Sequence, residues 1–290
     1  MPKTNYTIRS KWLGDAVLKI RKQTGLTLEE VGERMRWPQS KISRIENGMV
    51  RAHWGDIQDL LDLYEFHDTD QRKALLALAK SARERGWWHA YGATLDHPFA
   101  DLITLEATCR EICTYQNQVV PGLLQSKEYA QAMIGASKVW EHRDGVEKFV
   151  EVRTARKAIL TRDTPVTLWA ILGEAILYQR VGGATVMRDQ LRHILEIARM
   201  PNVTVQVLPF SAGASTGMYG PFTSLKFPSP GVPEVIYLEN LTGGLYLEHE
   251  DEVRRYTLAF NHLRASALPT KESTKLIAQV AEELQSDPRE

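Results

Sequence analysis

Between residues 25 and 48 the chain carries two short helical patterns separated by a brief turn, and this spacing constrains the fold more than any other feature. Thr27 and Glu30 form a capping-box pattern, in which the Thr hydroxyl caps the first turn and the Glu side chain returns to the Thr amide. Pro38 is expected at the first position of the second helix, and Gly48 at its end. Two short helices joined by such a turn are the helix-turn-helix pattern.

Apolar residues repeat with helical spacing on both sides of this pair, which predicts an all-α domain of five helices over residues 1–85. Gly25 is expected to cap the first helix. Gly32 costs a helix about 1 kcal/mol against alanine and therefore indicates the close approach of another helix. The predicted inward residues are Leu13, Ala16, Val17 and Ile20; Leu28, Val31 and Met35; Ile42 and Ile45; Ile57, Leu60, Leu61 and Tyr64; and Leu75, Leu78 and Ala82.

The charges of this neutral chain are unevenly distributed. Residues 1–55 hold eleven Lys and Arg against five Asp and Glu, a net charge of +6, so the remaining residues carry −6. A basic end on an acidic chain indicates a polyanionic partner, most simply a nucleic acid. The alternative is an ordinary solvated surface.

Composition and apolar patterning exclude several other classes. The richest apolar run, residues 74–79, is six residues long, whereas a membrane helix needs about 18 or more. No apolar segment follows the basic residues of the first twelve positions, so no secretory signal is expected. Cys109 and Cys113 are the only cysteines, too few for a disulfide scaffold. A cytoplasmic protein is expected.

The predicted helix-turn-helix resembles the Xre/Cro/cI class of bacterial repressors. The resemblance rests on residues 25–31 (GLTLEEV) and 39–48 (QSKISRIENG). It implies a domain that binds double-stranded DNA; a five-helix protein-interaction module is the alternative. The residues that it assigns to the DNA interface are Thr27, Gln39, Ser40, Lys41, Ser43, Arg44 and Asn47.

The resemblance also divides these residues by role. Gln39 and Ser40 match the start of the recognition helix, where relatives touch base edges, and Thr27 and Asn47 match positions that contact the DNA backbone. A glutamine amide at Gln39 can bond the N6 and N7 edge of adenine. Relatives often place a supporting glutamine at the position of Leu28, which leucine cannot replace.

The remaining residues of the predicted recognition helix have open roles. Arg44 is long enough to reach a guanine or a phosphate, and Lys41 is expected to contact a phosphate or a base. Ser43 contacts the DNA or only permits close approach to the groove. Glu46 is expected to hold the scaffold through an ion pair with an Arg. Arg36 occupies a turn position where relatives have glycine, so a left-handed backbone there would be strained.

Residues 86–290 predict a mixed α+β domain that begins near the Arg85–Trp88 and His97–Pro98 segments. A helix is expected from Leu102 to Ile112, with a turn at 121–122. Alternation at Val203, Val205 and Val207 indicates a strand. The other predicted elements are helices at 128–136, 146–160 and 184–200, strands at 165–172, 222–227, 234–239 and 244–248, and two final helices, the last carrying Leu276, Val280 and Leu284.

This region resembles the C-terminal domain of actinobacterial WhiJ-type regulators. That resemblance implies a regulator of development or secondary metabolism, often encoded with a small acidic or basic partner protein. The family usually has Arg-Gln where this chain has Arg156 and Lys157. The matching residues are Glu106; 120–125 (VPGLLQ) with Tyr129 and Ala130; 173–175 (GEA); Gly182 and Gly183; Met187; Gln190 and Leu191; 201–203 (PNV); and 208–210 (LPF).

No catalytic, metal or cofactor site is expected. Cys109 and Cys113 would lie on one face of the predicted helix. They could be two metal ligands or two small core residues, and core residues are the preferred interpretation. The glycine-rich stretch 211–220 fits no phosphate-binding motif and is expected to be an inter-strand loop. Trp87, Trp88 and Trp169 are expected to pack in the core and linker, with a ligand site as the alternative.

These patterns predict a sequence-specific transcriptional regulator and not an enzyme. Its C-terminal domain is expected to bind a partner protein or a ligand, and the chain to form a homodimer. An antitoxin-like protein that neutralises a small partner and autoregulates its operon is the second interpretation. An enzyme with a DNA-targeting head is the third.

Overall fold

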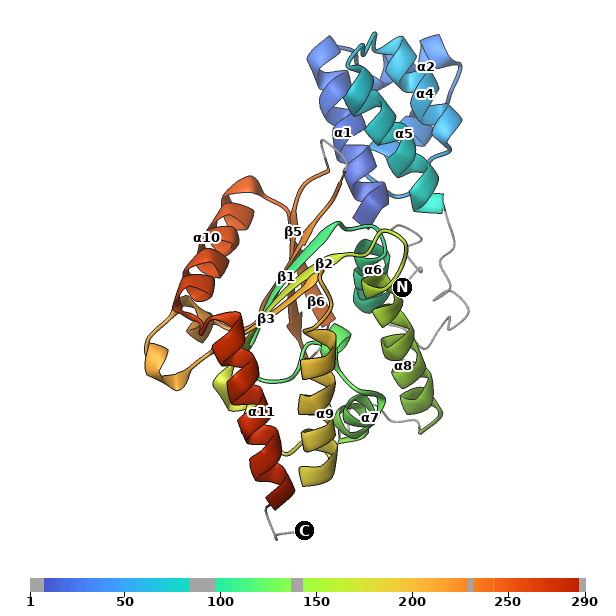
Figure 1. The fold of residues 1–290 in the computed structure, drawn as a ribbon. Coiled ribbons are helices and arrows are strands. Elements are labelled where there is room, and N and C mark those ends of the chain that lie inside the picture. Colours follow the sequence, from blue (N-terminus) through green and yellow to red (C-terminus); the bar gives the residue numbers. More distant parts are fainter. Residues whose placement is uncertain (1–7, 84–96, 137–142, 229–231, 242, 287–290) are drawn as a thin grey trace. The chain divides into compact units, whose positions relative to one another are not determined.

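The structure is a computed structural model that describes residues 8–83, 97–136, 143–228, 232–241 and 243–286. The described residues form two compact units, one with helices α1 to α5 and the other with all elements from α6 to α11 (Figure 1). The expected boundary after residue 85, and Trp87 and Trp88 with it, lies outside the described residues.

The first unit is the predicted bundle of five helices. They are α1 (Ile8–Thr24), α2 (Leu28–Met35), α3 (Gln39–Glu46), α4 (Trp54–Leu63) and α5 (Thr69–Arg83). Residues from each helix form one apolar core, and Val17, Val31, Ile42, Ile57 and Ala79 are fully buried in it. The helical spacing read from the sequence therefore identified the inward faces of α1 to α4 correctly, although Ala16 is only half-buried. In α5, Leu75 and Leu78 pack partly buried against this core, and the predicted Ala82 side chain lies outside the described residues.

Local signals in the sequence explain how α2 and α3 begin and end. Both halves of the capping box are present: Thr27 Oγ1 accepts from the Glu30 amide at 3.2 Å, and the Thr27 amide donates to Glu30 Oε2 at 2.8 Å. Arg36 ends α2 in the left-handed region, at φ 55° and ψ 39°. Pro38 is the residue before α3, with extended backbone, and so stands one position earlier than predicted.

The second unit contains a mixed sheet of six strands in the order β3-β2-β1-β4-β5-β6. β1 pairs in parallel with β2, and β2 with β3, while β4, β5 and β6 are antiparallel to their neighbours. The fold is therefore α+β, as predicted. The strands are β1 (Glu111–Gln116), β2 (Thr167–Gly173), β3 (Val203–Leu208), β4 (Phe222–Lys226), β5 (Val235–Asn240) and β6 (Gly243–Leu247).

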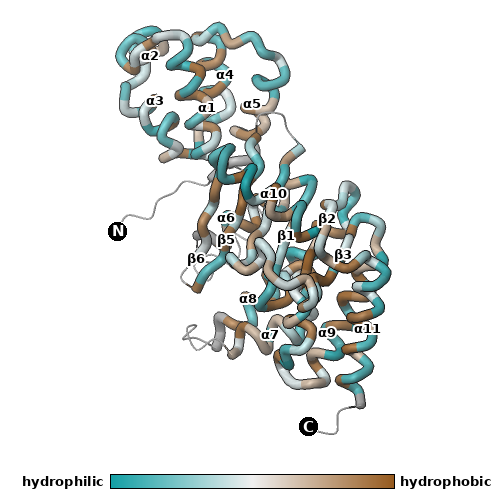
Figure 2. Tube along the Cα trace, turned by 90° about the vertical axis from the view of Figure 1, so that its left-hand side faces the viewer, coloured by the Kyte–Doolittle hydropathy of each residue, from teal (hydrophilic) through white to brown (hydrophobic). Residues whose placement is uncertain are grey.

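Helices cover the sheet of the second unit. α10 contributes Phe260 and Leu263 to a core on the face that carries Tyr115, Ile171 and Ile236. Figure 2 shows hydrophobic residues along the central strands and on the sides of the helices that meet them. The helices are α6 (His97–Glu106), α7 (Lys127–Ala136), α8 (Arg143–Arg156), α9 (Ala184–Ile197), α10 (Glu250–Ser266) and α11 (Thr270–Ser286), with short 3-10 helices η2 (Gly122–Leu124), η3 (Lys157–Leu160), η4 (Glu174–Tyr178), η5 (Phe210–Ala212) and η6 (Thr216–Tyr219).

The predicted helix from Leu102 to Ile112 is wrong in its second half. α6 ends at Glu106, and Ile112 lies in β1, at the centre of the sheet. Four successive residues of β1 are buried, since both faces of this strand are covered, so no polar alternation marked it in the sequence. Cys109 and Cys113 therefore do not share a helix face. Both are buried with free thiols, as expected of core residues.

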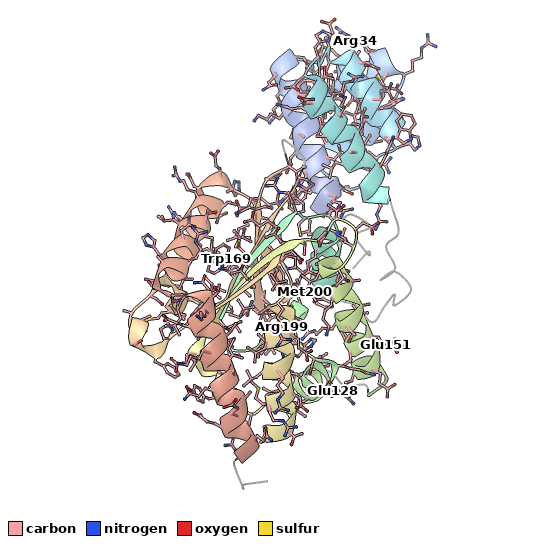
Figure 3. All side chains as sticks on the ribbon, viewed as in Figure 1. Arg34, Glu128, Glu151, Trp169, Arg199 and Met200 are labelled. Atoms are coloured by element: carbon pink, nitrogen blue, oxygen red, sulfur yellow. The ribbon has the colours of Figure 1, made fainter. Side chains whose placement is uncertain are left out.

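Trp169 packs within the second unit as expected. It lies partly buried on β2, beside the core that α10 covers, and its indole Nε1 donates to Gln206 Oε1 at 2.8 Å (Figure 3). The Arg264 guanidinium lies 4.9 Å from the centre of its ring. The glycine-rich stretch does join two strands, but much of it is folded as η5 and η6.

Candidate DNA-binding surface and pocket

Helix α3 packs directly against α1 at Gly14, where there is no room for a side chain. A Cβ atom on Gly14 would lie 2.5 Å from the carbonyl oxygen of Ile45 and 2.6 Å from that of Glu46. The backbones of α1 and the last turn of α3 therefore approach each other directly. This contact brings α3 close to α1 within the bundle.

A buried ion pair joins the same two helices. Arg21 Nε and Nη2 donate to the two Glu46 carboxylate oxygens at 2.6 and 2.8 Å, and Arg21 Nη1 donates to the Leu26 carbonyl at 2.7 Å. The hydrogen bonds that Arg21 donates to Glu46 raise the pKa of Arg21 against the opposing effect of burial. Glu46 thus holds the scaffold through an arginine, as the sequence indicated.

The opposite side of α3 presents an exposed row of polar side chains, which we call the α3 polar row. Gln39, Ser40, Arg44 and Asn47 are exposed and Ser43 is half-buried. Their spacing places all five on one stripe of the helix. Hydrogen bonds within α3 hold two of these side chains in place. Arg44 Nε donates to the Ser40 carbonyl at 3.1 Å, and Asn47 Nδ2 donates to the Ser43 carbonyl at 2.7 Å.

Lys41 is separate from this row. Its ammonium forms an ion pair with Asp56 Oδ1 at 2.9 Å and lies 3.5 Å from the centre of the Trp37 ring. The half-buried lysine therefore ties α3 to the first turn of α4. Its positive charge is partly neutralised before any phosphate approaches.

The remaining residue of the predicted interface, Thr27, is exposed at the N-terminus of α2. Its amide and its hydroxyl both donate to Glu30 Oε2, at 2.8 and 2.9 Å, so a contact of Thr27 with the DNA backbone would be made beside this carboxylate. Leu28, which stands where relatives carry a helper glutamine, is half-buried against the core. Gly32 allows close packing here, since its Cβ would lie 3.0 Å from the Trp37 carbonyl and 3.5 Å from Gln39 Cγ.

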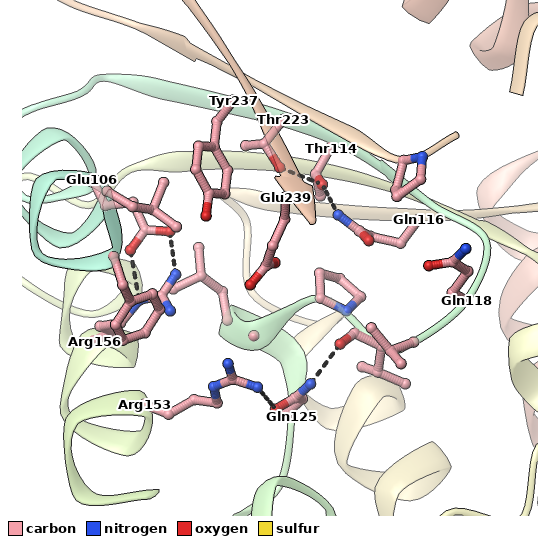
Figure 4. A pocket seen from close by; sticks show the side chains of 18 of the residues that line it. Glu106, Thr114, Gln116, Gln118, Gln125, Arg153, Arg156, Thr223, Tyr237 and Glu239 are labelled. Atoms are coloured by element: carbon pink, nitrogen blue, oxygen red, sulfur yellow. Dashed lines mark hydrogen bonds and ion pairs between the residues drawn. The ribbon is translucent and has the colours of Figure 1, made fainter. Parts of the chain in front are cut away.

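The second unit holds a pocket that the sequence did not predict. It has a volume of about 490 Å³ and lies between α6, α8 and η2 and the sheet face opposite α10 (Figure 4). Because side chains alternate along a strand, Ile112, Thr114 and Gln116 of β1 face this pocket while Tyr115 faces α10. The apolar part of its wall includes Phe99, Leu102, Ile112, Met133, Phe149 and Leu168.

One wall of the pocket contains a buried carboxylate and arginine. Arg156 Nε and Nη2 donate to the two oxygens of Glu106 at 2.8 and 2.6 Å. Burial acts to lower the pKa of Arg156, but the charge and hydrogen bonds of Glu106 outweigh it and raise that pKa. The Phe99 ring stacks 4.9 Å from the guanidinium. Arg156 is thus fully neutralised within the protein.

Arg153, one turn earlier on α8, is in a different situation. Its Nη1 donates to the neutral side-chain oxygen of Gln125 at 3.1 Å, and its buried Nε has no hydrogen-bond partner. Burial, together with the nearby charge of Arg156, lowers the pKa of Arg153 to about 10. The guanidinium therefore remains charged at neutral pH with no ion pair among the described residues.

The segment 120–125, which carries part of the WhiJ-type resemblance, forms the edge of the pocket and is held from several sides. Gln125 Nε2 donates to the Val120 carbonyl at 2.7 Å, and Gln190, fully buried on α9, donates to the Leu124 carbonyl at 2.7 Å. Lys157 Nζ donates to the Gln125 carbonyl, also at 2.7 Å. Gln125 and Gln190, both buried, therefore fix this loop. The loop in turn holds the Gln125 side-chain oxygen that accepts a hydrogen bond from Arg153.

Polar side chains cross the sheet at the other wall. Thr114 of β1 and Thr223 of β4 are register partners whose hydroxyls lie 2.9 Å apart, and Tyr237 follows on β5. Burial raises the pKa of Tyr237, so its phenol stays protonated. Glu239 of β5 is exposed where it lines the pocket (Figure 4). Thus the pocket joins an apolar wall to a few fixed polar groups.

In the described part of the chain, no three His, Cys, Asp or Glu residues are grouped as metal ligands would be. Burial raises the pKa of both Cys thiols, the Cys113 value to about 12. No helix within the described ranges is sufficiently long and apolar to span a membrane.

Comparison with known families divides the chain in the same way. A family model described as a helix-turn-helix domain matches residues 12–75, and one described as a domain of unknown function, DUF5753, matches residues 99–279. No curated protein and no solved structure matches the chain significantly. Since the second match covers more than half of the sequence, the chain belongs to the DUF5753 family and carries a helix-turn-helix domain ahead of that region.

Proposed function

We propose that the protein is a sequence-specific transcriptional regulator that binds double-stranded DNA through an Xre-type head, residues 1–85. The observation that carries the proposal is the α3 polar row, an exposed line of donors and acceptors on the second helix of a helix-turn-helix domain. In such domains the second helix enters the major groove with its N-terminal residues toward the bases. The net charge of +6 on residues 1–55 favours a polyanionic partner.

The seven residues of the interface take different parts in this proposal. Gln39 and Ser40 read base edges, because they begin α3 and are exposed. Arg44 reaches a guanine or a phosphate, and Ser43 permits close approach. Thr27 and Asn47 contact the DNA backbone from the N-terminus of α2 and the C-terminus of α3. Lys41 contacts a phosphate only when its ammonium shares or leaves Asp56.

Residues 86–290 serve, in this proposal, as a WhiJ-like regulatory domain that acts by binding and not by turnover. The pocket beside Arg153 favours a small molecule as the ligand of this domain. The protein acts in the cytoplasm, and two copies of the chain bind DNA together. A dimer is proposed because one head covers little DNA and paired half-sites about one helical turn apart are usual. A small protein encoded nearby remains the other candidate partner.

Selection from randomised DNA duplexes with the full chain tests the DNA-binding function. One motif should be enriched, as an inverted or direct repeat, and its affinity should fall linearly with the logarithm of salt concentration. Gln39→Ala and Arg44→Ala should change the motif, whereas Arg199→Gln, an exposed change in the second unit, should not. Absence of any enriched motif, or an unaltered motif in both head variants, contradicts the proposal.

The oligomeric state and the partner need separate measurements. Sedimentation should show a dimer on the selected site, and a monomer both free and on DNA contradicts this part. Affinity purification from the native host tests the second interpretation. A co-purifying small protein whose toxicity the chain suppresses would establish the antitoxin-like function instead of the regulatory one.

A further inference from the structure

Two arginines of α8 line the same pocket, and the protein neutralises only one of them. Arg156 has both oxygens of Glu106, but Arg153 has a single hydrogen bond, to the neutral amide oxygen of Gln125. The Arg153 side chain is half-buried, and a charge that is partly withdrawn from water without an ion-pair partner is costly. Glu239 and Glu106 favour the charged guanidinium, but neither forms an ion pair with it among the described residues. An anion in the pocket would supply that partner.

The free donors of Arg153 indicate the shape of that anion. Its buried Nε is unpartnered, and its Nη2 makes no hydrogen bond within the described residues. These two N–H groups form one side of the guanidinium fork, which matches the two oxygens of a carboxylate. Figure 4 shows the Arg153 guanidinium facing the space below Tyr237 and Glu239.

The charges around the pocket favour a monoanion. Glu106 already cancels Arg156, so the pocket interior offers one positive charge, while Glu239 adds a negative charge where it lines the pocket. A phosphate monoester, with nearly two negative charges at pH 7, would leave one of them uncompensated near these carboxylates. A carboxylate group would bring only one negative charge beside Glu239 and would pair that charge with Arg153.

The rest of the pocket requires a ligand with an apolar body. Phe99 and Phe149 form part of the wall next to α8, and Leu102, Ile112 and Leu168 continue it toward the sheet. The volume of about 490 Å³ lies within the usual range for small-molecule sites. Tyr237 offers a second polar contact, since its hydroxyl has no hydrogen-bond partner among the described residues.

We propose that this pocket binds a small organic monocarboxylate, whose carboxylate pairs with Arg153 and whose apolar part lies against Phe99 and Phe149. The inference rests on the proposed function in one respect only, that the second domain binds a ligand. It identifies the chemical class of that ligand and the residue that selects it.

Calorimetric titration of the full chain tests the inference with four probes, benzoate, 1-naphthoate, octanoate and decanoate. At least one should bind with a stoichiometry of one per chain, and its neutral amide should bind at least about tenfold more weakly, the loss of one charged hydrogen bond. Naphthyl phosphate should bind more weakly than naphthoate. No saturable binding by any of the four, or equal affinity for the amide, overturns the proposal.

Three variants locate the binding. Arg153→Gln should weaken carboxylate binding at least about tenfold. Arg153→Lys, which keeps the charge but loses the fork, should fall between it and the wild type. Arg199→Gln removes the same charge from an exposed position just after α9 and should bind as the wild type does (Figure 3). Equal losses in Arg153→Gln and Arg199→Gln would overturn the assignment to this pocket.

Two further measurements keep the outcomes distinct. Thermal unfolding of each variant shows whether it folds, and a folded Arg153→Lys that binds naphthoate as tightly as the wild type contradicts the fork. DNA selection is scored separately on the same preparations. Carboxylate binding without DNA binding refutes only the proposed regulator, whereas DNA binding without carboxylate binding refutes only this inference.

Discussion

Arg21 and Glu46 are held together by two hydrogen bonds of 2.6 and 2.8 Å, and both side chains are buried between α1 and α3. The pair lies on the inner side of the helix whose outer side carries the α3 polar row. The close contact at Gly14 and this ion pair both hold α3 against α1 from its inner side. In the proposed function, loss of the pair would therefore affect both stability and DNA binding.

Removal of one partner of this pair should destabilise the head strongly. Arg21→Met leaves the Glu46 carboxylate buried and unpaired, and such losses are about 3–5 kcal/mol of unfolding free energy. The double variant Arg21→Met with Glu46→Leu should recover part of the loss, since no isolated charge remains. Hydrogen exchange of the α3 amides in the full chain measures both effects.

An exposed ion pair supplies the control for this experiment. Asp251→Asn removes a carboxylate that pairs with Arg254 on the surface of α10 at 2.9 Å. Surface pairs contribute about 0–1 kcal/mol, so this variant should leave exchange in α3 unchanged. A loss below about 1 kcal/mol in Arg21→Met would show that the pair does not support α3.

Arg36→Gly should stabilise the protein. Arg36 ends α2 at φ 55° and ψ 39°, a conformation that costs a residue with a Cβ atom about 1–2 kcal/mol and glycine nothing. After subtraction of the higher entropy of glycine in the unfolded chain, a gain of up to about 1 kcal/mol is expected. The midpoint of urea denaturation, followed by helix signal, measures it.

Arg34→Gly is the matched control, since it removes the same side chain from an exposed position inside α2 (Figure 3). Glycine within a helix costs about 0.8–1.0 kcal/mol, so this variant should be less stable than the wild type. If both glycine variants lower the midpoint, the left-handed turn at Arg36 carries no strain.

The pH dependence of stability should report on His193 and Lys157. Burial and the adjacent Lys157 ammonium, whose Nζ lies 3.4 Å from His193 Nε2, lower the pKa of His193 below its usual 6.5. Below pH 6.5 the unfolded chain binds a proton that the folded chain does not, so stability is complete above that pH and falls as pH decreases toward the folded pKa. His193→Gln removes this dependence.

Calorimetric melting of the wild type and His193→Gln at pH 7.5 and 5.5 measures the difference. Carboxylates titrate in both proteins and cancel in the comparison. The wild type should lose more melting temperature than the variant on acidification. Equal losses would show that the pKa of His193 is not lowered in the folded chain.

The two halves of the chain differ in how far local sequence determines them. The head was predictable because Thr27, Glu30 and Gly48 mark helix ends by local hydrogen bonds and backbone geometry. β1 was not, because Ile112 continues the helical spacing of Leu102 and Leu105, and only the neighbouring strands make residues 111–116 a strand. Such pairing is decided by tertiary contacts that periodicity does not contain.

The pocket was missed for a related reason. Glu106 and Arg156 are fifty residues apart in sequence, and only the packing of α6 against α8 makes them an ion pair. The one local signal was the spacing of Arg153 and Arg156, three residues apart on one helix face, which the sequence alone could equally assign to a solvated surface. Glu106 and residues 120–125 carry part of the resemblance to other regulators, and the structure places them around this pocket.

The last prediction separates base recognition from general affinity within α3. Gln39 is exposed at the first turn of the helix, and loss of a bidentate base contact costs about 1–3 kcal/mol of discrimination. Gln39→Ala should therefore flatten base preference at one or two positions of the selected motif and leave non-specific binding nearly unchanged. Lys41→Ala should weaken binding to all sequences alike and reduce the salt slope by about one, as loss of a phosphate contact requires. An unchanged salt slope together with lower stability of Lys41→Ala would mean that Lys41 only stabilises the head, through its ion pair with Asp56. An unchanged motif in Gln39→Ala would mean that another face of the head contacts the bases.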